Sequence, residues 1–222
     1  MLPATPPAAI IFDLDGTLVD TVPARIGAWL AVFEEFGIGA ARDQIGPMIG
    51  MDGVRLALEV ARSAGEPVDA DRARQIDDRA GELFDKLNRE PSPLPGVRDA
   101  LAMLDRSDLT WAIATSSRPA QVSSSVAALG LDHEPRIVDG SSVEHAKPAP
   151  DLLLLAARQL AVEPGDAWYV GDSTWDMRAA GAAGMLPIGV LAGAAVDEST
   201  LREAGAAVVW GTLEELLGVG WG

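Results

Sequence analysis

The sequence contains no cysteine and only two histidines in 222 residues. The absence of cysteine excludes disulfides, thiolate catalysis and cysteine-ligated zinc, and it fits a reducing compartment. A triad of serine, histidine and aspartate would need His133 or His145 beside a nucleophilic serine, yet the GxSxG pattern typical of such serines is absent. We therefore expect chemistry based on neither cysteine nor histidine.

Basic residues are also scarce. The chain has 17 Lys and Arg residues against 33 Asp and Glu residues, which gives a formal net charge of −16. Nucleic acids and anionic membranes bind clustered basic side chains, so neither is an expected partner. No apolar run is long enough to cross a bilayer, and the first residues, MLPATPPAAI, lack the basic and long apolar regions of a secretory signal. We expect a soluble, cytoplasmic protein whose oligomeric state the sequence leaves open.

Six short apolar runs that end in Gly, Ser or Asp are spread along the chain, at residues 8–16, 109–117, 135–140, 167–173, 186–193 and 206–211. Their continuous rather than alternating hydrophobicity indicates strands buried on both faces, as in a parallel sheet covered by helices. Between them, residues 96–108 and 148–162 carry Leu or Ala at helical spacing. Right-handed crossovers would make this succession an α/β fold with a doubly wound parallel sheet.

The stretch from Val22 to Glu90 has no strand signal, and its apolar residues recur at helical spacing. Two helical faces are expected, one formed by Ile26, Leu30, Phe33 and Gly37 and the other by Ala73, Ile76, Ala80, Leu83 and Leu87. The return segment REPSPLPGV is rich in proline, as is typical of linkers that join rather than pack. We predict a Rossmann-like core of residues 1–19 and 91–222 and an inserted, all-helical cap of residues 20–90.

Ligands of doubly wound sheets bind at the carboxyl ends of the strands, so the polar residues that follow the apolar runs should converge. These residues and their near neighbours are carboxylates, hydroxyls and one of the two lysines of the chain: Asp13, Asp15, Thr115, Ser116, Lys147, Asp172 and Asp176. Oxygen ligands in this number suit a hard cation, and the lysine and hydroxyls suit a phosphoryl group. The pattern predicts a phosphoryl-transfer site.

Each carboxylate receives a separate role in this hypothesis. Asp13 and Asp172 are candidate direct ligands of Mg²⁺ and Asp176 a ligand through water, although Mn²⁺ would satisfy similar ligands. With the cation and lysine as compensation, Asp13 can stay ionised and attack phosphorus, which forms an aspartyl-phosphate. Asp15 would protonate the leaving oxygen and later accept a proton from the hydrolytic water.

The remaining residues would bind the phosphate. Thr115 and Ser116 would hold the phosphoryl oxygens, and Lys147 would act as a point charge on both nucleophile and phosphate. Ordinary alternatives exist for each: the hydroxyls could cap a helix, and the lysine could lie at the surface. Asp172 and Asp176 could be favourable charges in the first turn of a helix.

Four segments in order, DLDGTLVDT, ATSS, KPAPD and GDSTWD, resemble the four motifs of the haloacid-dehalogenase-like hydrolase superfamily, in its subgroup with a helical cap after the first motif. The likeness covers nearly the whole chain. The resemblance implies Asp13 as nucleophile, Asp15 as acid/base and the Asp15 main-chain carbonyl as a further Mg²⁺ ligand. It also implies that the cap closes over the site and excludes water.

The branch of the superfamily is indicated by three positions. An aspartate at the place of Asp15 resembles the phosphotransferases and not the dehalogenases or phosphonatases. β-Phosphoglucomutases carry a histidine where this chain has Arg25 and a cap-loop arginine where it has Gly53. These departures favour a phosphatase for a small phosphorylated metabolite, similar to phosphoglycolate phosphatases, over a sugar phosphomutase.

Substrate contacts are expected from the cap, at Arg25, Gly50, Met51 and Arg55, because binding residues often lie on loops above a rigid scaffold. The alternative for both arginines is a solvated charge on a helix face. Two non-enzymatic functions also stay open: a phospho-accepting regulator resembling receiver domains, and a binding protein that has lost turnover. Receiver domains are much shorter and have nothing that corresponds to Asp15.

Overall fold

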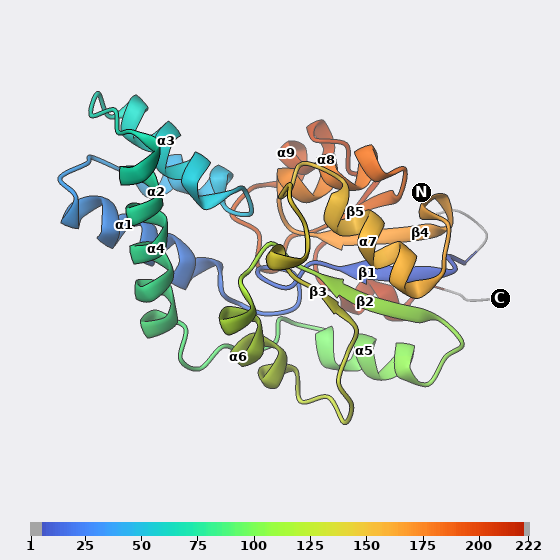
Figure 1. Cartoon of the computed structure of the whole chain (residues 1–222). Coiled ribbons are helices and arrows are strands. Elements are labelled where there is room, and N and C mark those ends of the chain that lie inside the picture. The colour runs from blue at the N-terminus through green and yellow to red at the C-terminus, as the bar shows by residue number, and fades with distance from the viewer. Residues whose placement is uncertain (1–5, 220–222) are drawn as a thin grey trace.

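The computed structural model describes residues 6–219 and contains a six-stranded sheet (Figure 1). The first five residues, on which part of the prediction of no signal sequence rests, lie outside the described residues. In chain order the strands are β1 (Ala9–Phe12), β2 (Thr110–Ala114), β3 (Ile137–Val138), β4 (Ala167–Gly171), β5 (Leu186–Val190) and β6 (Val208–Trp210). All neighbouring strands are parallel, and their order is β3-β2-β1-β4-β5-β6. The predicted doubly wound α/β fold is confirmed.

Helices cover both faces of this sheet, as Figure 1 shows. One face packs against α5 (Val97–Asp105), α6 (Pro119–Leu129) and α10 (Glu214–Leu217). The other packs against α7 (Asp151–Leu160) and α8 (Thr174–Ala183), with α9 (Glu198–Glu203) at the β5 and β6 end, and two short 3-10 turns, η2 (Gly140–Ser142) and η3 (Pro164–Asp166), lie in connections. No helix within residues 6–219 has both the length and the apolar character that a membrane crossing requires.

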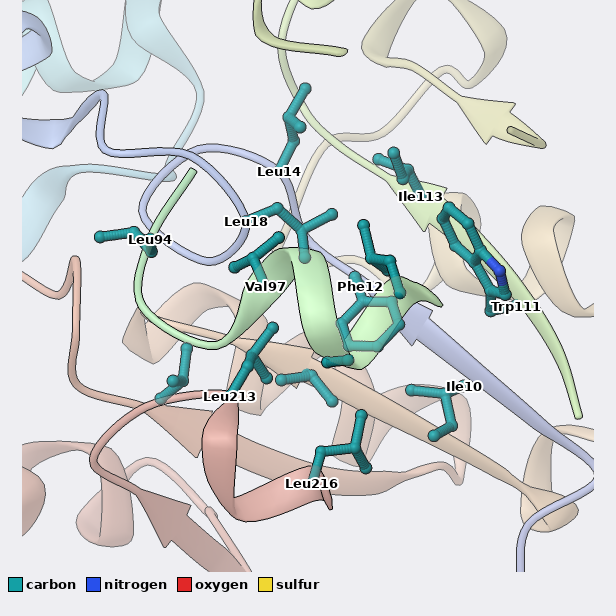
Figure 2. Close-up of a cluster of buried hydrophobic side chains, with 14 of the residues drawn as sticks. Ile10, Phe12, Leu14, Leu18, Leu94, Val97, Trp111, Ile113, Leu213 and Leu216 are labelled. Atoms are coloured by element: carbon teal, nitrogen blue, oxygen red, sulfur yellow. The ribbon is translucent and has the colours of Figure 1, made fainter. Parts of the chain in front are cut away.

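The two faces of β1 belong to different hydrophobic clusters because side chains alternate along a strand. Ile10 and Phe12 point into the cluster drawn in Figure 2, where they meet Val97 of α5 and Leu216 of α10. Ala9 and Ile11 face the cluster formed with α7 and α8. All four β1 side chains are fully buried, which is why the strand reads as an unbroken apolar run.

The segment between β1 and α5 is helical, and within its described residues it forms no strand. It contains α1 (Val22–Glu35), α2 (Arg42–Ile45), η1 (Gly46–Met48), α3 (Gly53–Ser63) and α4 (Ala70–Leu87). These helices pack into a hydrophobic cluster of their own, to which the core contributes Trp175. In Figure 1 they stand beside the sheet, beyond the carboxyl end of β1.

Two details of the predicted helical faces are wrong. Helix α1 ends at Glu35, so Gly37 lies beyond it, exposed and with a φ of 70°. On α4, Leu87 is 56% exposed, and Phe84 is the buried residue at that end. The expected face followed a repeat of 3.5 residues and so included Leu83, whereas the 3.6 residues per turn of an α-helix place Phe84 on the buried stripe. Leu87 is exposed because it is the last residue of α4, at the end of that stripe.

The two connections between the helical insert and the sheet lie side by side. Asp20 N donates to Ser92 O at 2.9 Å, and Leu94 N donates to Leu18 O at 3.0 Å. Leu94 is also buried in the cluster with Leu18. The proline-rich return segment therefore packs as well as joins, which corrects the expectation of a simple linker.

Candidate active site

The carboxyl ends of β1, β2 and β4 meet where the strand order of the sheet reverses. Asp13 follows β1, Thr115 follows β2 and Asp172 follows β4. A pocket of about 410 Å³ opens at this edge, lined by these loops and by residues of the helical insert. Its wall includes all seven residues that the sequence places at the strand ends and nearby: Asp13, Asp15, Thr115, Ser116, Lys147, Asp172 and Asp176.

Lys147 lies in the connection before α7 and is only 3% exposed. Its Nζ donates to Asp13 Oδ1 at 2.6 Å and to Asp176 Oδ1 at 2.8 Å. The same nitrogen lies 5.3 Å from the centroid of the Tyr169 ring. The alternative of an ordinary surface lysine is therefore wrong.

Asp176 belongs to the first turn of α8 and is held by several donors. Its Oδ2 accepts from Ser173 N at 3.0 Å and from Ser173 Oγ at 2.6 Å, which completes a reciprocal capping box. Its Oδ1 accepts from Tyr169 OH at 3.2 Å as well as from Lys147. Asp176 is thus a helix-capping charge and a pocket residue together, so the two interpretations coexist.

Burial acts on the ionisation of the two strand-end carboxylates. It raises the pKa of Asp13 to about 7, with Asp176 adding to the rise and Lys147 opposing it. Burial likewise raises the pKa of Asp172 well above its usual range, and repulsion from Asp176 and Asp13 adds to this rise. A hydrogen bond from Thr17 Oγ1 to Asp172 Oδ1, at 3.1 Å, acts in the opposite direction and lowers this pKa. Burial disfavours the charge of Lys147, but the attraction of Asp13 and Asp176 is stronger, so its pKa is raised.

These carboxylates fit a divalent cation. Within residues 6–219, Asp13, Asp172 and Asp176 each offer one carboxylate oxygen, and these atoms lie within 4.8 Å of one another. When ionised, the three buried carboxylates carry two more negative charges than Lys147 neutralises. Oxygen donors with such an excess of negative charge are the ligands that Mg²⁺ prefers. The repulsion among these carboxylates also contributes to the raised pKa of Asp13 and of Asp172.

Asp15 lies two residues beyond Asp13 in different surroundings. Its Oδ1 accepts from Thr21 Oγ1 at 2.6 Å, and its Oδ2 accepts from Ser117 Oγ and, at 3.2 Å, from Arg25 Nη2. The side chain of Asp15 is 14% exposed, so it reaches the pocket. The two carboxylates of the first motif thus face different partners, Lys147 for one and a hydroxyl and guanidinium cluster for the other.

The two hydroxyl residues after β2 do not cap a helix. Helix α6 begins at Pro119 with Arg118 as its N-cap, while Thr115 Oγ1 accepts from Ser117 N at 3.1 Å. Ser116 Oγ is buried and has no hydrogen-bond partner among the described residues. A buried hydroxyl on the pocket wall without a partner is available to an anion, since such groups are costly when left unpaired.

The predicted cap residues divide into two groups. Arg25, Gly50 and Met51 line the pocket. Gly50 has a φ of +92°, and a Cβ there would lie 2.8 Å from Ser173 Oγ, so the cap loop approaches the core closely. Arg55 differs from the expectation: its side chain is 55% exposed, pairs with Glu59 at 3.1 Å and is not part of the pocket wall.

Trp175 joins the two parts of the chain at the pocket. Trp175 is a residue of α8 in the core, yet its side chain packs in the hydrophobic cluster of the helical insert. Its Nε1 donates to Pro47 O at 3.2 Å. This contact and the ion pairs of Arg25 and Arg118 across the pocket hold the insert against the core.

Sequence patterns did not predict several residues that line the pocket or contact its side chains. Ser117 and Gln121 contact Arg25, and Thr21 contacts Asp15. Ser117 could have been found, because it is the last letter of the ATSS segment. Others on the same wall, Asp52, Asp77 and Arg118, lie among many similar surface charges and carry no sequence signal.

The fold and site define the class of protein. The family described as haloacid dehalogenase-like hydrolase matches residues 10–190, which include all four motifs, and the chain belongs to this family. The resemblance found in the motifs is thereby confirmed, and with it the assignment to the hydrolases.

Individual relatives are similar along nearly their whole length. The chain is 32% identical to a probable phosphatase, IndB, of Dickeya dadantii, over 94% of this chain and 91% of that one. It is 34% identical to a phosphoglycolate phosphatase of Chromobacterium violaceum, over 87% of this chain and 88% of that one. Among solved structures, a hydrolase from Pseudomonas syringae is 32% identical, with a TM-score of 0.89 over 95% of this chain and 96% of that one.

Proposed function

We propose that this enzyme is a Mg²⁺-dependent phosphatase that hydrolyses a small phosphomonoester through an aspartyl-phosphate. The observation that carries the proposal is the placement of buried Asp13 at the switch point of the sheet, between Lys147 and the carboxylate of Asp172. The phosphatase names of the two relatives described above support the same activity. Phosphoglycolate, a sugar phosphate and a nucleotide are all candidate substrates at this stage.

In the first step, a carboxylate oxygen of Asp13 attacks phosphorus, and the bond from phosphorus to the leaving oxygen breaks. Asp15 gives its proton to that oxygen, so an alcohol leaves and Asp15 becomes a carboxylate. Lys147 stays beside the nucleophile and balances its charge. Thr115 and the unpartnered hydroxyl of Ser116 hold the phosphoryl oxygens, where charge builds in the transition state.

In the second step, water attacks the phosphorus of the aspartyl-phosphate. Asp15 takes a proton from this water, and the bond from phosphorus to the Asp13 oxygen breaks. Inorganic phosphate is released, and both aspartates return to their starting states. Thr21, Ser117 and Arg25 hold Asp15 in place during this exchange, because each donates to one of its oxygens.

Asp13, Asp172 and Asp176 would hold Mg²⁺, together with the Asp15 carbonyl, and Mn²⁺ would suit the same donors. When bound, the cation supplies positive charge to the phosphoryl oxygens and lowers the repulsion between phosphate and carboxylates. Both oxygens of Asp176 already accept hydrogen bonds from protein groups, which favours contact through water.

We further propose that residues 20–90 act as a cap domain over a core of residues 1–19 and 91–222. The separate hydrophobic cluster of the insert and its paired connections support this division. Arg25, Gly50 and Met51 are the proposed substrate contacts of the cap, since they line the pocket. A cytoplasmic location is proposed as well, in keeping with the absence of cysteine.

Phosphate release from a panel of phosphomonoesters, with Mg²⁺ and with a chelator, tests the proposal. We expect metal-dependent release from at least one phosphorylated acid, sugar or nucleotide. Isomerised sugar phosphate without phosphate release would instead favour a sugar phosphomutase, even though Arg25 and Gly53 replace the histidine and arginine of β-phosphoglucomutases. No turnover with any ester would favour a phospho-accepting or binding protein.

A further inference from the structure

A wall of the pocket supplied by α4 carries an ion pair that crosses from insert to core. Arg118, at the start of α6, directs Nη2 to Asp77 Oδ2 at 2.6 Å and Nη1 to Asp78 Oδ1 at 3.0 Å. Asp77 and Arg118 both line the pocket, whereas Asp78 does not, and its side chain is 69% exposed. The carboxylate of Asp77 thus stands on the pocket side of the pair.

Asp77 occupies space that another side chain would need. Gly53 lies at the start of α3, and a Cβ added there would overlap the carboxylate of Asp77. Asp52, the N-cap of α3, is a second carboxylate on this wall. Burial raises the pKa of Asp77, Arg118 opposes this rise, and the neighbouring carboxylates of Asp52 and Asp78 add to it.

The cations of the pocket are already paired. Among the described residues, the cationic side chains on its wall are Arg25, Arg118 and Lys147. Each is within 4.0 Å of a carboxylate: Asp15 for the first, Asp77 for the second and Asp13 for the third. A second anion beside α4, beyond the phosphoryl group, would therefore meet Asp52 and Asp77, and the cation on that side of the pocket, Arg118, is already paired with Asp77.

Neutral donors are available on the same wall. Gln121 accepts from Arg25 Nη1 through Oε1 at 3.3 Å, which leaves Nε2 as the donor beside Gly81 of α4. Gly81 has no side chain, so the helix backbone and the amide share this part of the pocket. An amide donor suits the hydroxyl groups of an uncharged ligand.

We propose that Asp77 determines specificity by excluding negatively charged leaving groups, so that the substrate is the phosphomonoester of an uncharged, hydroxylated alcohol. This inference rests on the proposed phosphatase function and narrows its substrate class. Unit charges a few ångströms apart at a partly exposed site repel by an amount that corresponds to about a tenfold change in rate or affinity. The same repulsion is screened by salt, which gives the inference a second measurable property.

Substrates matched in size but not in charge test this most directly. One pair is 2-hydroxyethyl phosphate and phosphoglycolate, and a longer pair is sorbitol 6-phosphate and 6-phosphogluconate. We expect the wild-type enzyme with Mg²⁺ to prefer the uncharged member of at least the longer pair by about tenfold in kcat/KM. The preference should shrink at high ionic strength.

Two variants should move this preference in opposite directions. The measured quantity is the ratio of kcat/KM for the uncharged member of a pair to kcat/KM for its acidic member. Asp77→Asn removes the negative charge and frees Arg118 on the pocket side, so this ratio should fall about tenfold. Arg118→Gln leaves Asp77 without its partner, so the ratio should shift further toward the uncharged substrate. Asp71→Asn is the matched control, because it removes the same charge from α4 at a side chain that is 83% exposed and outside the pocket.

A role of Asp77 in folding alone would change kcat/KM for both members of a pair alike and leave the ratio constant. Faster turnover of the acidic members by the wild type would overturn the inference and leave the phosphatase intact. Equal shifts of the ratio in Asp77→Asn and Asp71→Asn would also overturn it. Failure to hydrolyse any ester, including p-nitrophenyl phosphate, would overturn the proposed function and this inference together.

Discussion

At the scale of single residues, Asp13 and Asp15 show how one short segment can supply two kinds of carboxylate. Asp13 is buried and its pKa is raised by that burial, while Lys147 lies 2.6 Å from its Oδ1. Asp15 is partly exposed and accepts from Thr21, Arg25 and Ser117. The proposed roles, nucleophile for Asp13 and acid/base for Asp15, require such different surroundings.

Asp13→Asn tests the nucleophile. The amide cannot form the acyl-phosphate, so phosphate release should fall by at least about a thousandfold. The amide oxygen can still accept from Lys147, and one buried charge is removed, so the midpoint of urea unfolding in a chelator should not fall. Release at more than a tenth of the wild-type rate would show that Asp13 is not the nucleophile.

Asp15→Asn tests the acid and base. We expect kcat/KM for an alkyl phosphate to fall by about 100-fold to 10,000-fold, the usual contribution of proton transfer. The fall should be smaller for p-nitrophenyl phosphate, since a good leaving group needs little protonation. Steady-state rates with both esters measure this difference. Equal losses for the two esters would contradict a proton-donating role.

At the scale of elements, α4 serves both packing and the pocket. One side of the helix buries Ala73, Ile76, Ala80 and Phe84, and the opposite side carries exposed ion pairs. The same helix brings Asp77 and Gly81 to the pocket wall. A single amphipathic helix therefore sets how the insert packs and which groups it presents to a substrate.

Substitutions on this helix should separate its two faces. Ile76→Ala removes a fully buried side chain and should lower the free energy of unfolding by about 2–4 kcal/mol. Leu87→Ala is the control on the same helix, and it should change that free energy by less than about 0.5 kcal/mol because Leu87 is 56% exposed. Urea unfolding followed by circular dichroism measures both. Similar losses for the two variants would show that the buried face of α4 is assigned wrongly.

At the scale of the whole molecule, the pocket depends on segments far apart in the sequence. Lys147 reaches Asp13 across 134 positions, and Thr17 reaches Asp172 across 155. Three carboxylates and one ammonium are thereby buried together, which destabilises the fold when no cation is bound. Folding and metal binding should therefore be coupled.

Mg²⁺ should raise the thermal stability of the protein because it binds the folded carboxylates and not the unfolded chain. At 100 times its Kd, the expected gain is about 2.7 kcal/mol, and a chelator should reverse it. Asp172→Asn should abolish most of the gain, while Asp71→Asn, whose carboxylate is remote from the cluster, should keep it. Differential scanning fluorimetry with and without Mg²⁺ measures the shift in Tm. A gain in Asp172→Asn equal to that of the wild type would place the cation elsewhere.

Local patterns in the sequence were enough to predict the sheet and the residues at its edge. The six strands correspond to six apolar runs in the sequence, and the carboxyl ends of parallel strands meet at one edge. The convergence of Asp13, Thr115 and Asp172 follows from topology alone. Lys147 was recognisable because lysine is rare in this chain.

Only the tertiary structure decided the cap side of the pocket. Periodicity did not separate Leu87 from Phe84, because residues three apart share one face of a helix and only the packing shows that Leu87, at the end of α4, is exposed. Arg55 and Arg118 look alike in sequence, yet Arg55 pairs with Glu59 on its own helix and Arg118 pairs with Asp77 across the pocket. Such contacts depend on how the helical insert packs against the core. The hydrophobic pattern within each of these two segments carries no information about the interface between them.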